Sequence, residues 1–295
     1  MHVRSFSSGR CWRLSPAAVS AVVILMLAMV SGCGSSKETA PATVEDHFLR
    51  AKTLFDEGNY LEAINEFTVI TLQYQGSSRA AEAQYFLGES RYKRGEYLLA
   101  IVEYSALKRN MPASPLVQDA QYKIGLCYYM LSPKSTLDQQ YTKKAIDELQ
   151  SFVEYYPSHA LVQDAAAKIR ELTTRLAKKD FETAQLYSTL EYYKAAQFYF
   201  DDVIEKYHDT EYAPLAYMGK VKVLMARKKY EDALTEINRF IERFPDSVLR
   251  HQADQLKDSI SSELKSSKQA SGKNSGSTES PGGGSRAYSV LKTTN

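Results

Sequence analysis

Residues 87–112 read LGESRYKRGEYLLAIVEYSALKRNMP, and this stretch decides the fold. Ala100 and Tyr104 are four residues apart and therefore lie on one face of a helix, where the small Ala lets a second helix approach closely. Gly95 suits a tight turn between two helices, because glycine adopts positive φ at little steric cost. Pro112 cannot continue a helix and marks its end. The stretch therefore predicts two helices joined by a tight turn.

The same pattern occurs five times along the chain. Each copy has Ala three residues after its first residue, a large apolar residue four residues later and a further large apolar residue seven residues after that; the copies begin at Tyr60, Tyr97, Thr142, Tyr193 and Tyr230. The intervals between copies are 37, 45, 51 and 37 residues, which is typical of arrays of helix pairs. Gly58-Asn59 repeats the turn at Gly95, and Gly125 follows Gly88 by 37 residues. We therefore expect an all-α solenoid of about five helix pairs.

Two of the intervals are longer than the others. The 45-residue interval contains eight extra residues, which we place in a loop within Leu131–Tyr141. The 51-residue interval contains fourteen extra residues, within Leu161–Leu190. That run has no Gly or Pro, so it predicts one long helix joining the third and fourth repeats.

The N-terminus has the pattern of an export signal. Residues 1–16 carry three Arg and no acidic residue, and a short apolar run follows from Ala17 to Val30. A run of this length suits the core of a signal peptide better than a membrane span. The run ends Val30-Ser31-Gly32-Cys33, which resembles a bacterial lipobox, so we expect cleavage before Cys33 and a covalent N-acyl diacylglycerol on its sulfur. An ordinary secretory signal with an incidental Cys is the alternative interpretation.

Removal of residues 1–32 changes the composition. The full chain has 37 Lys and Arg, 35 Asp and Glu and a formal net charge of +2, and loss of three Arg leaves a mature charge of −1. Cys11 and Trp12 are also lost, so the mature chain has no Trp and has Cys127 as its one free thiol. This balance gives no support for general nucleic-acid binding, which needs a clustered basic surface. No Asp follows Cys33, so we expect sorting to the outer membrane.

The C-terminal end differs from the repeats in composition. Twelve of the twenty residues in 266–285 are Gly or Ser. The segment has too few apolar residues for their burial to offset the loss of chain entropy on folding. We therefore predict a disordered tail over 265–295 and a flexible tether over 33–44. Between them we expect one continuous array over 45–264, with repeats at 45–80, 81–117, 118–162, 163–212 and 213–264.

The repeats resemble a known motif. The tetratricopeptide repeat has matching residue types at the positions of Leu87, Gly88, Tyr97, Ala100, Tyr104 and Pro112. A lipobox, five such repeats, a loop in the third and a long helix in the fourth together resemble the outer-membrane assembly lipoproteins of the BamD, or ComL/YfiO, family. The most specific match is residues 138–145, DQQYTKKA, followed by Phe152 and by Tyr155-Tyr156-Pro157. The resemblance covers about residues 33–262.

This resemblance implies a function that the repeats alone do not, because a repeat fold does not name its ligand. It implies a lipid-anchored subunit on the periplasmic face of the outer membrane of a Gram-negative bacterium. Such a subunit binds the periplasmic domains of the barrel-forming subunit of the β-barrel assembly machinery. It also helps to recognise the C-terminal signal of unfolded outer-membrane proteins. Accessory lipoproteins are further partners to consider.

A candidate peptide-binding groove follows from the repeat positions. Positions five and twelve of the first helix in each pair point inward in such arrays, and in the first three repeats all six are aromatic: Phe48, Phe55, Tyr85, Tyr92, Tyr122 and Tyr129. Tyr has an apolar ring with a polar hydroxyl, which suits an extended peptide with aromatic side chains. The fourth and fifth repeats instead have Phe181, Ser188, Met218 and Met225. Our hypothesis is that repeats one to three hold a substrate peptide and repeats four and five contact the machinery. The alternative is that the six rings pack between helix pairs.

The mature sequence contains no recognisable catalytic or metal-binding constellation. Its His residues are dozens of residues apart, and none has a partner at metal-ligand spacing. Cys127 lies in an apolar first helix, where a buried small hydrophobe is expected. Asp138 is expected to cap the loop. We therefore expect no enzyme, no metal and no cofactor beyond the lipid on Cys33.

Three other functions remain open from the sequence. A different periplasmic scaffold with the same repeats, such as a coordinator of cell-wall synthesis, usually lacks the lipobox or adds a coiled-coil segment. A glycan-capturing outer-membrane lipoprotein usually carries more Trp. A lipid-anchored hydrolase would need an acid, base or nucleophile constellation.

Overall fold

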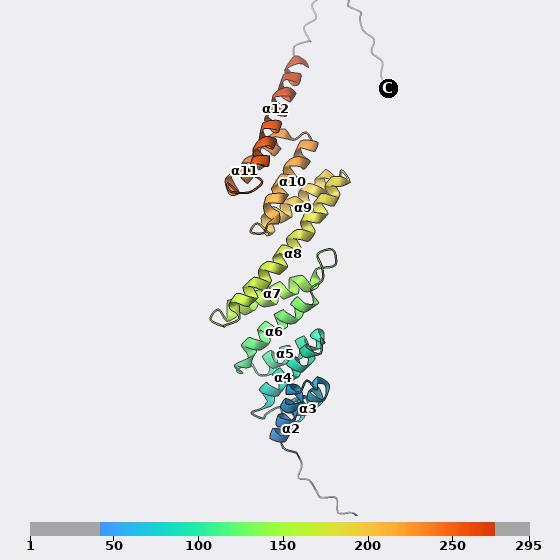
Figure 1. The fold of residues 1–295 in the computed structure, drawn as a ribbon, viewed down its shortest axis with the longest axis vertical. Coiled ribbons are helices and arrows are strands. Elements are labelled where there is room, and N and C mark those ends of the chain that lie inside the picture. Colours follow the sequence, from blue (N-terminus) through green and yellow to red (C-terminus); the bar gives the residue numbers. More distant parts are fainter. Residues whose placement is uncertain (1–41, 275–295) are drawn as a thin grey trace, which may run out of the picture. The chain divides into compact units, whose positions relative to one another are not determined.

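The computed structural model describes residues 42–274, with side chains to residue 269. All regular elements of this part are helices (Figure 1): α2 (Val44–Asp56), α3 (Tyr60–Gln73), α4 (Ala80–Lys93), α5 (Tyr97–Asn110), α6 (Leu116–Leu131), α7 (Gln140–Tyr155), α8 (Val162–Thr189), α9 (Tyr193–Lys206), α10 (Tyr212–Ala226), α11 (Tyr230–Arg243) and α12 (Arg250–Asn274). None of these helices is long and apolar enough to cross a membrane. The predicted signal peptide, Cys33 and nearly all of the predicted tether lie outside the described residues, as does the chain beyond 274.

The helices form five consecutive pairs, from α2–α3 to α10–α11, followed by α12. Each helix packs against its neighbours along the chain, and the first helices of successive pairs also contact each other from α4 to α10. The array is therefore a tetratricopeptide-like succession of helix pairs, which confirms the predicted fold class (Figure 1).

The repeat pattern forms the core of each pair. The five repeated Ala residues have no exposed surface, and the five large residues four positions later are at most 2% exposed. These large residues are Phe67, Tyr104, Leu149, Phe200 and Ile237. Small and large side chains alternate across each pair, so the two helices approach closely at Ala and interlock at the large residue.

The glycines have two separate roles. Gly88 and Gly125 allow close packing, because a Cβ at Gly88 would lie 2.6 Å from the Tyr104 ring and one at Gly125 would lie 2.7 Å from Leu149. Gly58 and Gly95 instead have φ of +83° and +76° in the turns, as the sequence predicts.

The fourth and fifth pairs make the same turn without glycine. Glu191 has a φ of 62° and Lys228 a φ of 59°, at the positions that Gly58 and Gly95 occupy in the first two pairs. A residue with a Cβ is strained in this left-handed region, by about 1–2 kcal/mol. These two turns therefore carry backbone strain that the first two avoid.

The two long intervals produce segments that contact each other. The predicted long helix is confirmed as α8, which has 28 residues, and the predicted loop is the segment 132–139 between α6 and α7. Arg175 of α8 donates hydrogen bonds of 3.2 Å to the carbonyl oxygens of Ser132 and Pro133, and Lys179 donates to that of Leu137. The loop therefore lies against the middle of the lengthened helix.

Helix α8 contributes to two cores. Its Ala165 and Leu172 belong to the cluster around Phe152 in α7, whereas its Ala184 belongs to the cluster around Phe200 in α9. The third and fourth helix pairs are therefore joined through one continuous helix rather than through a turn.

The C-terminal boundary differs from the prediction. Helix α12 buries Ala253 and Ile260 and then continues to Asn274, ten residues into the segment expected to be a tail from residue 265. Residues 265–269 are helical although their side chains are exposed. The average Gly and Ser content of 266–285 hides the fact that its first glycine is Gly272, so the helix has no strong breaker before that residue.

Candidate peptide-binding face

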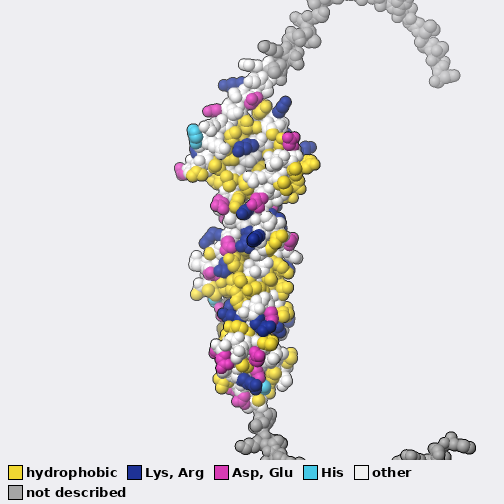
Figure 2. Space-filling model, turned by 45° about the vertical axis from the view of Figure 1, so that its right-hand side comes forward, with side chains coloured by type: hydrophobic (Ala, Val, Ile, Leu, Met, Phe, Trp, Pro, Cys, Tyr) yellow, Lys and Arg dark blue, Asp and Glu magenta, His cyan; other side chains and the backbone are white. Residues whose placement is uncertain are grey.

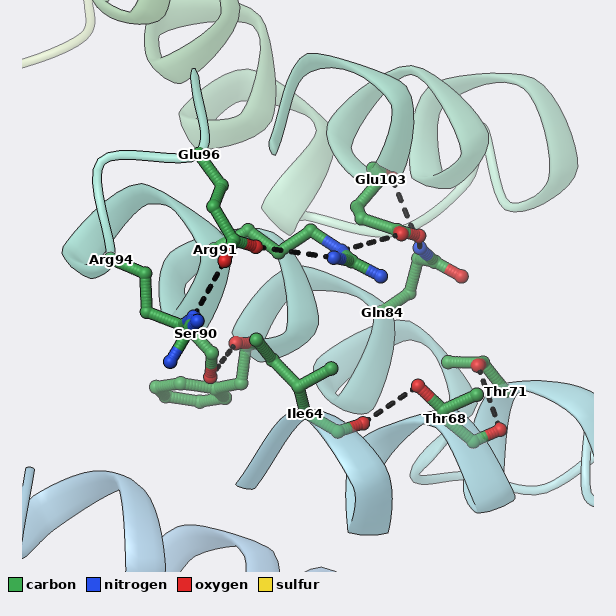
Figure 3. A network of polar contacts seen from close by, with 10 residues as sticks. Ile64, Thr68, Thr71, Gln84, Ser90, Arg91, Arg94, Glu96 and Glu103 are labelled. Carbon is green, nitrogen blue, oxygen red and sulfur yellow. Dashed lines mark hydrogen bonds and ion pairs between the residues drawn. The ribbon is translucent and has the colours of Figure 1, made fainter. Parts of the chain in front are cut away.

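A repeated polar contact holds the two helices of a pair together. In the second pair, Gln84 Nε2 donates a 2.8 Å hydrogen bond to Glu103, and Arg91 Nε donates a 3.0 Å bond to the same carboxylate (Figure 3). In the third pair, Gln121 donates to Glu148, also at 2.8 Å. Buried polar groups are costly unless paired, so these contacts fix the alignment of first and second helices. The sequence analysis missed them, although Gln84 and Gln121 are 37 residues apart.

The first column of aromatic residues lies in the core. Phe48 and Tyr122 are each 6% exposed, and Tyr85 is partly buried. Each ring packs on a ring of the second helix in its own pair, with centroid distances of 6.1 Å for Phe48–Phe67, 5.7 Å for Tyr85–Tyr104 and 5.4 Å for Tyr122–Phe152. These three side chains therefore lie between the first and second helices of their pairs and stabilise the packing of the two helices.

The second column is partly exposed, and each ring is covered by a lysine. Phe55, Tyr92 and Tyr129 are partly buried. A lysine ammonium lies 5.0–5.4 Å from the centroid of each ring: Lys52 over Phe55, Lys123 over Tyr92 and Lys168 over Tyr129. Such a contact contributes about 0.5–1 kcal/mol. We call these three side-chain pairs the lysine-covered rings.

Each of these lysines also forms an ion pair. Lys52 pairs with Asp56 at 2.9 Å, Lys123 with Glu89 at 2.7 Å and Lys168 with Asp164 at 2.9 Å. Lys123 lies on α6 and Lys168 on α8, whereas the rings that they cover lie on α4 and α6. The lysine-covered rings of pairs two and three therefore link neighbouring helix pairs along the face of the first helices.

Tyrosine hydroxyls reinforce the junction between α6 and α8. Tyr122 donates a hydrogen bond to Asp164, and Tyr129 donates one of 2.7 Å to Glu171. The hydrogen bonds from Lys168 and Tyr122 lower the pKa of Asp164, whereas burial raises the pKa of Tyr122 above its usual range. At neutral pH this junction therefore holds an ionised Asp164 and a neutral Tyr122.

The sequence carries a signal for this junction that our sequence analysis did not use. Residues 116–120 and 161–165 both read LVQDA, and Lys-Ile follows at 123–124 and again at 168–169. The first half of α8 therefore repeats α6 at an interval of 45 residues. Lys168 has the same place in α8 that Lys123 has in α6, and each lysine lies over a Tyr of the preceding first helix.

The face continues into a hollow on pairs four and five. Its lining includes Phe181, Ser188 and Met218, three of the positions that the sequence assigned to the inner face, but not Met225. Phe200, Leu215 and Lys222 line the same hollow. In Figure 2, exposed apolar side chains form patches over the array, with charged side chains between and around them. The lining also includes Leu249 and the polar residues Gln185, Thr189 and Gln252, so the hollow offers a surface that is part apolar and part polar, with one cationic side chain.

Residues considered for chemistry have structural partners. Cys127 is fully buried, as expected, and burial raises the pKa of its thiol to about 12. Asp138 accepts a 2.9 Å hydrogen bond from the backbone N–H of Gln140 and so caps the loop before α7. His47 pairs with Glu66 at 2.7 Å. Within residues 42–269, no cluster of three or more His, Cys, Asp or Glu side chains could hold a metal ion.

These features define a class of protein: a tetratricopeptide-like scaffold whose first helices present an aromatic, lysine-bearing face. A family model described as YfiO, outer membrane lipoprotein, matches residues 41–229, and the chain belongs to this family. A curated relative, the outer membrane protein assembly factor BamD of Caulobacter vibrioides, is 25% identical over 221 residues, which cover 73% of this chain and 72% of the relative.

Solved structures with similar folds are more distant. The TPR2AB domain of yeast Sti1 in its pHSP90 complex is 18% identical, with a TM-score of 0.41 and coverage of 77% of this chain and 86% of that one. The TPR domain of P58(IPK) is 16% identical, with a TM-score of 0.38 and coverage of 87% and 65%.

Proposed function

We propose that this protein is a non-enzymatic subunit of the machinery that assembles β-barrel proteins in the outer membrane. The observation that carries the proposal is the family match over residues 41–229, together with a relative named as an assembly factor. A scaffold of helix pairs supports this role, because such arrays offer long surfaces for binding extended or folded partners. The chain acts by holding other proteins rather than by chemistry.

The anchor is a lipid on Cys33. After removal of residues 1–32, the acyl chains on this Cys hold the protein at the periplasmic face of the outer membrane, since several acyl chains give stable anchoring. The family description as an outer membrane lipoprotein supports this step. Incorporation of labelled palmitate tests it: Cys33→Ala should abolish the label, and retained label would refute the assignment.

The two ends of the array have different partners. The lysine-covered rings of pairs one to three hold extended segments of unfolded outer-membrane proteins, while Phe48, Tyr85 and Tyr122 support them from the core. The hollow on pairs four and five receives a side chain of the barrel-forming subunit. The partly exposed rings and the apolar side chains within the lining of the hollow support this division.

A pull-down from detergent-solubilised outer membrane tests the main proposal. Recovery of a large barrel protein with periplasmic domains is the expected result. Leu215→Lys, in the hollow, should lose that protein, whereas the matched control Leu72→Lys, exposed on α3, should retain it. Recovery of cell-wall enzymes or of glycans in its place would overturn the proposal in favour of another envelope scaffold.

Peptide binding tests the groove separately. Tyr92→Ala and Tyr129→Ala should each weaken binding of a peptide from the C-terminal end of an outer-membrane barrel protein, by removing an apolar surface together with its lysine contact. Tyr155→Ala, an exposed ring on α7, is the control. Unchanged affinity in folded Tyr92→Ala and Tyr129→Ala variants would refute the groove.

A further inference from the structure

One second helix of the array is apolar on both sides. Helix α5 buries Ala100, Tyr104 and Leu107 in the core, and its opposite side exposes Leu98, Leu99 and Val102 by 48–59%. An amphipathic surface helix normally has one apolar side and one polar side. A helix that is apolar on both sides is expected to have a second contact.

Among the second helices, only α5 has a large apolar residue at all three of these positions; α9 has Lys194, Ala195 and Phe198 there, and Phe198 is 61% exposed. At the positions of Leu98, Leu99 and Val102, α7 has Lys143, Lys144 and Asp147, and α11 has Glu231, Asp232 and Thr235. The repeat architecture therefore does not require apolar residues here. The neighbouring α3 shares part of the feature, because its Leu61 corresponds to Leu98 and is 50% exposed.

We propose that this outward face of α5, with Leu61 of α3, rests on the lipid surface beside the membrane anchor. The proposal rests on the proposed function, since it requires the lipid on Cys33. An apolar strip in contact with a bilayer adds a second attachment to an acyl anchor. We call Leu61, Leu98, Leu99 and Val102 the lipid-facing strip.

The length of chain between the anchor and the array supports this occupant. Ten residues, 34–43, lie between Cys33 and Val44 at the start of α2, so eleven residue-to-residue steps join the two. Fully extended, such a segment reaches at most about 36–40 Å. Packed helices lie about 8–10 Å apart, so the second pair is within reach of the bilayer surface when the anchor is inserted.

Charge complementarity supports the same occupant. Lys108 and Arg109 lie in the last turn of α5, and Arg109 is exposed in line with Leu98 and Val102 along the helix. An apolar strip that ends in basic residues matches the interface of a bilayer with anionic headgroups. A protein that bound this strip would not need to lie next to the anchor. Binding of such a protein in place of lipid is the competing outcome of the test.

The lack of Trp in the mature chain makes the contact measurable. Val102→Trp places a single indole on the lipid-facing strip, and Thr235→Trp places one at the same repeat position of α11. Each lipidated full-length variant is reconstituted into vesicles of phosphatidylethanolamine and phosphatidylglycerol that contain brominated lipid. We expect strong quenching of Val102→Trp fluorescence, more by shallow than by deep bromines, and little quenching of Thr235→Trp fluorescence.

Further variants and outcomes separate this inference from the proposed function. Adding Leu98→Gln and Leu99→Gln to Val102→Trp should reduce the quenching, with unchanged helical circular dichroism. Equal quenching of the two Trp positions, or none in either, in protein that remains vesicle-bound would overturn the inference and leave the anchor intact. Protein that fails to bind vesicles at all would refute the anchor, and with it this contact. Capture of a protein on the strip with no lipid quenching would also overturn it.

Discussion

Replacing Gly88 with Ala tests the close approach that the repeat pattern implies. The added Cβ would lie 2.6 Å from the Tyr104 ring, which is fully buried and donates a hydrogen bond to Glu89. Overpacking costs about 1–3 kcal/mol. Displacing the ring also weakens a hydrogen bond to a charged group, worth about 1.5–3 kcal/mol when lost entirely. The gain in helix propensity from Gly to Ala offsets about 1 kcal/mol. We expect a net destabilisation of about 2 kcal/mol.

Thermal unfolding followed by circular dichroism measures this effect. For an array of this size, 2 kcal/mol corresponds to a Tm lower by about 4–8 °C. Gly76→Ala is the control, because a Cβ at that position meets nothing within 4 Å. Tyr104→Leu removes the ring, so Gly88→Ala should cost much less in that background. A neutral or stabilising Gly88→Ala in the natural background would refute the packing argument, as would equal costs in the two backgrounds.

Three further predictions concern turns, the loop and the thiol. Glu191→Gly and Lys228→Gly should each leave stability unchanged or raise it by up to about 1 kcal/mol, since relief of left-handed strain exceeds or balances the entropy cost of glycine; a Tm lower by several degrees would contradict this. Arg175→Ala should increase hydrogen exchange in segment 132–139 and not in α11. Cys127 should react with maleimide only on unfolding, and fast labelling of the native protein would contradict its burial.

The repeat fold was predictable from the sequence because its signals are local. The Ala and large-residue positions, the turns at Gly58 and Gly95, and the long Gly- and Pro-free run each depend on residues within one or two turns of helix. The C-terminal extent of α12 was not predicted, because an average over 266–285 conceals where its first glycine lies. Local propensity within that segment, rather than its mean composition, sets the end of the helix.

The candidate face was predictable only in part. Repeat positions identified the six aromatic residues, but they could not separate the buried column from the exposed one, since burial depends on how successive pairs stack. The lysines over Tyr92 and Tyr129 come from the following pair, so their contacts depend on the offset between pairs. The LVQDA sequence occurs at 116–120 and again 45 residues later at 161–165. Aligning α6 with α8 on this sequence gives the offset between the two pairs and would have revealed the lysine contact.

Helix α8 belongs to both halves of the array. One continuous helix takes part in the cores on both sides of the junction between the aromatic face and the hollow on pairs four and five. A helix advances 1.5 Å and turns by about 100° per residue, so its length sets both the separation and the relative rotation of the two binding surfaces. An insertion of one residue in α8 would leave both surfaces intact and aim them in different directions.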